Sequence, residues 1–132
     1  MLFRSGLGDR PDDPCGKDWH PIGGDFGDPD LAAAISQTLN MNKTVSLVAF
    51  GHMHRTLRHT KKLERKAVFK SPEGTIYLNA ANVPRIVQEN GVKLRNFSLV
   101  FLDGGMVTKV ALLWVGKDYQ VAAEEIFYNS LV

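Results

Sequence analysis

The chain has little cysteine, almost no net charge and no long apolar run. Cys15 is the single cysteine, so an internal disulfide cannot form and a reducing compartment is favoured. The 16 basic and 14 acidic residues leave a net charge of +2, which gives no general argument for nucleic acid or an anionic membrane as a partner. No apolar run approaches the roughly 20 residues of a membrane span, and residues 1–6 carry no secretory or transit signal. We therefore expect a soluble protein without a membrane partner.

Composition divides the chain into an acidic loop and a basic remainder. The 132 residues, of which 44% are hydrophobic, fit one small domain or part of a larger one. Residues 1–30 hold seven acids against three bases, a balance of −4, which leaves +6 for the rest. Residues 1–29 are rich in Gly, Pro and Asp and show neither helix nor strand periodicity. We expect a loop over 1–29 and regular structure over 30–132.

The regular part opens with signals for a helix and a buried strand. Asp28 suits a helix N-cap with Pro29 at the first helical position, and residues 40–42 end the apolar periodicity. Residues 44–50 are almost wholly apolar, which predicts a strand buried on both faces.

Further elements follow as a meander. Strands are expected at 65–70, 75–78, 95–103 and 106–115, with tight turns at 71–74 and 103–105. The spacing of Val121, Glu124, Glu125 and Tyr128 predicts a terminal helix over 118–131. The sequence therefore predicts an α+β fold: helix, buried strand, antiparallel meander and terminal helix.

Two histidines directly follow the apolar strand, in the string Gly51-His52-Met53-His54. Neutral imidazole is a common ligand of zinc, iron and manganese, and a turn begun by glycine lets both rings converge. The alternative is a chance His-x-His pair in a surface loop. A mononuclear structural zinc site is disfavoured, because Cys15 and two other histidines are the only further soft or imidazole ligands.

The string Val-Ser-Leu-Val-Ala-Phe-Gly-His-Met-His at 45–54 resembles the last metal-binding motif, Gly-His-x-His, of the calcineurin-like metallophosphoesterases. Residues 74–81 resemble the strand and asparagine-bearing turn that follow this motif in the superfamily. Residues 6–10, 13–19 and 24–31 look like the branch found in cyanobacteria and plants. The resemblance covers most of the chain.

This resemblance implies a layered α/β/β/α sandwich, with a mixed or antiparallel sheet and flanking helices, that hydrolyses a phosphoester as a phosphatase does. His52 and His54 would each ligate one of two divalent ions, Mn, Fe, Zn or Co, and a metal-activated water would attack the phosphate. The family's other ligand motifs, Asp-x-His, Gly-Asp-x-x-Asp, Asn-His and a further histidine, are expected upstream of Met1. We therefore expect a C-terminal portion of the domain, weakly active or inactive alone, that self-associates or depends on a missing N-terminal half. The expected compartment is the cytoplasm or the plastid stroma.

Two strings near the start imitate the missing motifs. Asp18-Trp19-His20 matches Asp-x-His, and residues 24–28 match Gly-Asp-x-x-Asp. Neither follows an apolar strand, and only a few residues separate them where the family has a whole β-α-β unit. We expect both to be loop residues.

Substrate contacts are expected from Arg10, Arg55 and Asn79, with a phosphorylated small molecule or macromolecule as the partner. The stretch 55–70 contains seven lysines and arginines beside the two histidines and could attract a phosphate. A solvated strand edge protected by lysines is the competing interpretation. The rival function is a non-catalytic fragment or a module that binds a partner or nucleic acid through this edge. Nucleic acid is disfavoured, since Phe69 is the only aromatic residue there.

Overall fold

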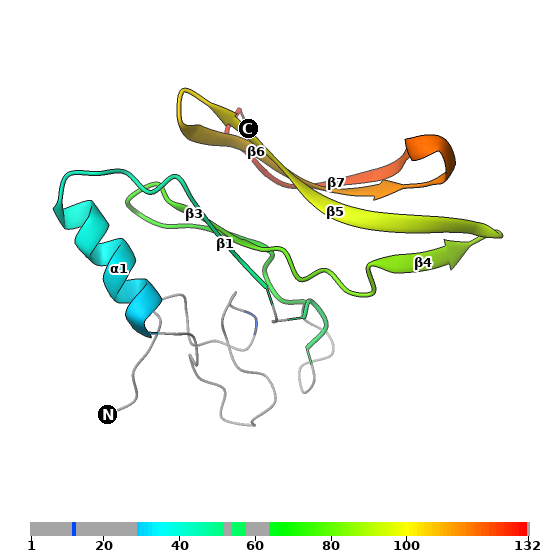
Figure 1. Ribbon diagram of the computed structural model, residues 1–132, viewed down its shortest axis with the longest axis horizontal. Coiled ribbons are helices and arrows are strands. Elements are labelled where there is room, and N and C mark those ends of the chain that lie inside the picture. The colour runs from blue at the N-terminus through cyan, green and yellow to red at the C-terminus, as the bar shows by residue number, and fades with distance from the viewer. Residues whose placement is uncertain (1–11, 13–28, 52–53, 58–63, 132) are drawn as a thin grey trace. The chain divides into compact units, whose positions relative to one another are not determined.

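The computed structural model describes residue 12 and residues 29–51, 54–57 and 64–131 (Figure 1). The chain forms two compact units, Met1–Asn79 and Ala80–Val132. Within the described ranges there is one α-helix, and the strands form two sheets, so the expected α+β class is confirmed. No helix in these ranges has both the length and the apolar character needed to cross a membrane.

The helix of the first unit, α1, runs over Pro29–Asn40, as the proline start and the asparagine-rich end predict. Asn42 adopts a left-handed φ of 57°, and its N–H donates to the Leu39 carbonyl at 3.1 Å, which closes the last turn. Ile35 packs with Tyr77 in the core of this unit, and Leu39, Val48 and Phe50 surround the pair. Asp28, the expected cap, lies outside the described residues.

The sheet of the first unit has the order β1-β3-β2, with β1 at Leu47–Phe50, β2 at Val68–Lys70 and β3 at Ile76–Asn79. β1 runs parallel to β3, and β2 runs antiparallel to it. The expected turn between β2 and β3 is confirmed: the Gly74 N–H donates to the Ser71 carbonyl at 2.9 Å, and Gly74 has a φ of 91°.

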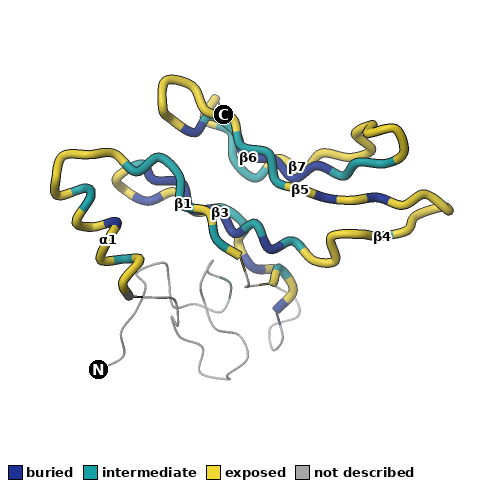
Figure 2. The backbone as a smooth tube through the Cα atoms, in the orientation of Figure 1, coloured by how far each residue is buried: buried dark blue, intermediate teal, exposed yellow. Residues whose placement is uncertain are grey.

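The prediction of a strand buried on both faces is wrong for β1. Ala49 is exposed in β1, whereas all four residues of β3 are buried (Figure 2). The physical reason is position, because β1 forms an edge of this sheet and β3 is its central strand.

The second unit is an antiparallel sheet of order β4-β5-β6-β7. Its strands are β4 at Ile86–Glu89, β5 at Val92–Asp103, β6 at Met106–Val115 and β7 at Val121–Asn129. Val110 and Leu112 of β6 are at most 1% exposed and form the centre of this sheet. The Gly104-Gly105 hairpin between β5 and β6 is confirmed, with φ of 56° and 79°.

The prediction of a terminal helix over 118–131 is wrong, because residues 121–129 form strand β7, which pairs with β6. Only Lys117–Tyr119 form a single 3-10 turn, η1, and even there Asp118 has a non-helical φ of 59°. β6 offers an unpaired edge, and Val121, Ile126 and Tyr128 favour the extended conformation. Sheet pairing therefore overrides the helical spacing of the sequence.

Candidate functional site

The parallel strands β1 and β3 end side by side. Phe50, the last residue of β1, is paired with Asn79, the last residue of β3. Because parallel strands share one direction, the segments that begin at Gly51 and Ala80 leave from the same edge of the sheet. In open α/β sheets, ligands bind beyond the carboxyl ends of the parallel strands. This edge, which we call the β1–β3 edge, is the candidate site.

Gly51 does not need a glycine-specific conformation. Its φ lies outside the left-handed region, and nothing lies within 4 Å of an added Cβ. A turn that only glycine can make is therefore not what directs the following residues. His52 and Met53 lie outside the described residues, so the convergence of the two imidazoles stays a prediction.

His54 is exposed and is held through its backbone. Its carbonyl accepts a hydrogen bond of 2.9 Å from Nε of Arg65. Arg65 is only 5% exposed. The Arg65 backbone N–H donates in turn to the Arg55 carbonyl at 2.8 Å. Arg65 thus binds two successive carbonyls, those of His54 and Arg55, and fixes the chain there.

A short two-stranded stem continues from this contact. Thr56 and Glu64 form an antiparallel bridge, and Leu57 is 2% exposed. The Arg55 guanidinium binds Oε2 of Glu64 through Nη2 at 2.7 Å and Nε at 2.9 Å. The stem therefore anchors the chain directly after the Gly-His-x-His string.

The expected substrate contacts differ in their surroundings. Asn79 is 7% exposed at the end of β3, and its N–H donates to the Ala67 carbonyl at 2.7 Å. Arg55 is half-buried in its ion pair with Glu64. Arg10 lies outside the described residues. Of the two that the structure describes, Asn79 is the one at the paired strand ends.

At least three of the four described cations of the 55–70 stretch have contacts within the first unit. Besides Arg55 and Arg65, Lys66 lies 3.8 Å from a carboxylate oxygen of Asp12, and its N–H donates to the Asp12 carbonyl. Lys70 is exposed on β2, an edge strand of the sheet. This arrangement agrees with the lysine-protected strand edge.

A metal pair needs several donors of suitable chemistry. Imidazole suits Mn, Fe, Zn and Co, and His54 is exposed. Across the ranges that the structure describes, no group of three or more His, Cys, Asp and Glu residues could hold a metal ion. The look-alike strings at 18–20 and 24–28 lie outside those ranges. The described residues therefore include a side chain of the type that binds such metals, but too few of them to hold a metal ion.

One titratable group near the site has a shifted pKa. Burial raises the pKa of the Tyr77 phenol above its ordinary value of 10.0, and the negative charge of Glu73 raises it further. Tyr77 packs in the core with Ile35, and its ring centroid lies 6.1 Å from that of Phe69. Its role is structural.

Comparison of the chain with protein-family models, curated proteins and solved structures gives no match. The features of the chain that bear on function are thus the motif strings and the β1–β3 edge. Nothing in the sequence around Arg65 signals its contact with His54, because that contact depends on the pairing of Thr56 with Glu64.

Proposed function

We propose that this chain carries the Gly-His-x-His part of a dinuclear metal site that hydrolyses phosphoesters. The observation that supports the proposal is the register of β1 and β3. It brings the residues after Phe50 and the asparagine at position 79 to one sheet edge, where parallel strands commonly present ligands.

The residues act in distinct ways in this proposal. His52 and His54 each offer an imidazole nitrogen to a metal ion, and Arg65 holds the backbone of His54 in place. A pair of divalent cations supplies Lewis acidity, which neutralises phosphate charge and makes water more acidic. Asn79 is the last residue of β3 and is suited to orient the segment that begins at Ala80.

A second metal ion and full coordination require more donors than His52 and His54 offer. In this proposal they come from carboxylates and histidines supplied by a segment outside this sequence. The metal identity is set by availability, because such histidine sites accept Mn, Fe, Zn or Co.

The rival function, partner or nucleic-acid binding through 55–70, has less support. Arg55 is engaged by Glu64, Arg65 is buried against the His54 carbonyl, and Lys66 lies near Asp12. A cation that is already paired inside the protein offers little to a phosphate backbone.

The test is calorimetric titration of the full chain with Mn²⁺ and with Zn²⁺. Three proteins are compared: the unaltered chain, the double variant His52→Ala, His54→Ala, and the matched double variant His20→Ala, His59→Ala, which removes the other two histidines. We expect weak binding that is lost in the first double variant and kept in the second, with any Mn²⁺-dependent hydrolysis of 4-nitrophenyl phosphate following the same order.

Equal binding by both double variants would contradict the proposal. Tight binding of two equivalents that depends on His20 would show instead that the string at 18–20 supplies ligands, and the interpretation of that string as loop would be wrong.

A further inference from the structure

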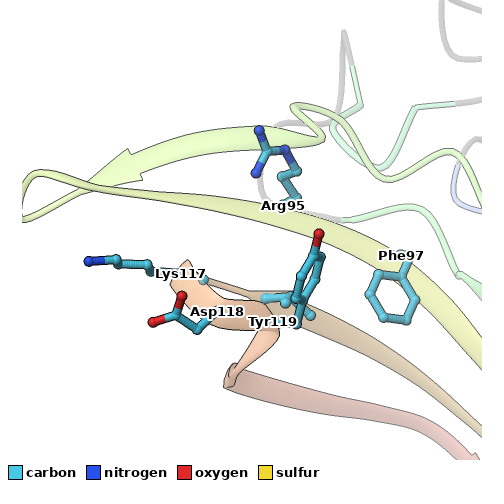
Figure 3. A pocket seen from close by; sticks show the side chains of 7 residues that line it. Arg95, Phe97, Lys117, Asp118 and Tyr119 are labelled. Atoms are coloured by element: carbon cyan, nitrogen blue, oxygen red, sulfur yellow. The ribbon is translucent and has the colours of Figure 1, made fainter.

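The second unit contains a hollow of its own, at the end of the sheet where β6 turns into β7. Its volume is about 490 Å³, within the range of small-molecule sites. The lining residues all belong to this unit: Arg95, Phe97, Val115, Gly116, Lys117, Asp118 and Tyr119 (Figure 3).

The register of the sheet explains why these side chains meet. Arg95 and Phe97 are two residues apart on β5, so both point to the same face. Arg95 is paired with Val115 of β6, which places Val115 on that face as well. The floor of the hollow is therefore part apolar and part cationic.

The turn after β6 supplies the wall. The Gly116 N–H donates to the Gln120 carbonyl at 2.9 Å, which closes a tight loop. Inside it, Asp118 and Tyr119 both adopt left-handed backbone, with φ of 59° and 60°. Residues with a Cβ rarely adopt this region, and such conformations gather at ligand sites.

Tyr119 gains no burial from this conformation, because it remains 93% exposed. Figure 3 shows its ring beside that of Phe97, with the hydroxyl toward Arg95. In the described part of the chain, neither Phe97 nor Tyr119 forms an aromatic ring contact. Two aromatic rings thus line one hollow without stacking on each other.

The charges of the hollow favour an anion. Arg95 and Lys117 are cationic and Asp118 is anionic, so the lining carries one excess positive charge. With the residues that the structure describes, Arg95 forms no ion pair and no side-chain hydrogen bond. A planar guanidinium of this kind binds carboxylate or phosphate through two parallel hydrogen bonds.

We propose that this hollow binds a small ligand that joins a planar aromatic ring to an anionic group. The ring lies against Phe97 and Tyr119, and the anion binds the Arg95 guanidinium. A nucleoside phosphate and an aromatic carboxylate share this chemistry. The site is independent of the metal site proposed above, since none of its residues lies in the first unit.

The experiment titrates the full chain with four probes in the presence of EDTA, which removes metal-dependent binding. Adenosine 5′-monophosphate and benzoate carry both ring and anion, adenosine carries the ring alone, and ribose 5-phosphate carries the anion alone. Binding is followed by saturation-transfer NMR and calorimetry. We expect millimolar or tighter binding of at least one of the first two probes, and weaker binding of adenosine and ribose 5-phosphate.

Matched variants assign the site. Arg95→Ala is compared with Lys93→Ala, which removes an exposed cation from the same face of β5. Phe97→Ala is compared with Phe69→Ala, because Phe69 is a similarly exposed aromatic residue (39% against 44%) that lies in the first unit. Loss of the charged contact in Arg95→Ala is expected to weaken binding of the anionic probes by about tenfold. Phe97→Ala and Tyr119→Ala are expected to weaken binding of the ring-bearing probes, while Lys93→Ala and Phe69→Ala bind as the unaltered chain does.

Because Arg95 and Tyr119 are exposed, we expect the Arg95→Ala and Tyr119→Ala variants to fold, and circular dichroism checks this. Absence of saturable binding by both ring-bearing anions, or equal losses in Arg95→Ala and Lys93→Ala, would overturn the proposal. A dimer that is lost in Tyr119→Ala, with no probe binding, would assign the hollow to a second copy of the chain.

Discussion

Single residues of this chain show how a polar group is kept within a packed unit. The Arg65 guanidinium reaches a backbone carbonyl, and the Asn96 amide donates to the carbonyls of Asn82 and Pro84 at 3.3 and 3.2 Å. Each side chain fixes a segment that has no regular hydrogen-bond ladder of its own. A buried donor that lost its acceptor would cost about 1–3 kcal/mol, so these contacts specify loop positions.

Tyr77 gives the stability of the first unit an alkaline limit. Its folded-state pKa is raised, so the folded state holds the phenol proton more tightly than the unfolded chain does. The resulting stabilisation is fully present below the unfolded value near 10.0 and is lost as the pH rises through the folded value. We expect the free energy of unfolding in urea to fall from about pH 9 upward.

Tyr77→Phe isolates this effect from the lysines, which titrate in a similar range. The variant keeps the ring in the core and removes the proton, so its unfolding free energy should fall less steeply with pH. Tyrosinate absorbance should show one late-titrating tyrosine in the unaltered chain and none in the variant. Parallel pH profiles for both proteins would refute the role given to Tyr77.

Elements differ in how far the sequence determines them. α1 and the strand 106–115 were predictable because their signals are local: a proline start, an asparagine end and a glycine hairpin. β4 was not predicted, although Asn90-Gly91 after it is a strong hairpin signal and both residues have a positive φ. The misassigned segment 121–129 shows the limit, because the open edge of β6 decides its conformation and lies outside any local window.

The sequence likewise predicts only the local features of the candidate site. The end of a strand followed by Gly-His-x-His can be located from the apolar run alone. The alignment of that end with Asn79 depends on parallel pairing between segments 29 residues apart, as the Leu47–Ile76 pair shows. Arg65 could not be assigned, because its position follows from the stem at Thr56 and Glu64.

The two turns that flank β6 should respond to substitution in opposite directions. Gly105 has a φ of 79° with nothing within 4 Å of an added Cβ, so Gly105→Ala pays only backbone strain, about 1–2 kcal/mol. Asp118 already bears that strain at a φ of 59°, and Asp118→Gly should relieve part of it, raising stability by up to about 1 kcal/mol. Urea unfolding followed by the far-ultraviolet signal measures both.

Because both variants lie in one sheet, each serves as the control for the other. A loss of stability in Asp118→Gly would show that its side chain stabilises the turn by more than the backbone strain costs.

On the scale of the whole molecule, the apolar residues of the second sheet stand out. The register places the half-exposed residues Ile86, Phe97, Phe101, Val121 and Ile126 on one face. Their exposed fractions run from 43% to 56%. Exposed apolar side chains gathered on one face are typical of surfaces that associate with a partner.

We therefore expect the chain to self-associate as its concentration rises, through this face. Phe101→Glu combined with Ile126→Glu should shift sedimentation velocity profiles toward the monomer. Met41→Glu is the matched control, since Met41 is 58% exposed directly after α1, in the first unit. A monomer at all concentrations, or an equal shift in the control, would argue against association through this face.

The sequence separation of paired strands also sets an order of events as the chain folds. In the second unit every strand pairs with its neighbour in sequence, through hairpins that close small loops. β1 and β3 must instead close a loop across the whole 51–75 interval before they pair. Local contacts form faster than distant ones, so amide protons of β5 and β6 should gain protection from hydrogen exchange first. The β1–β3 edge would then be among the last parts of the protein to take shape, and the first to open under stress.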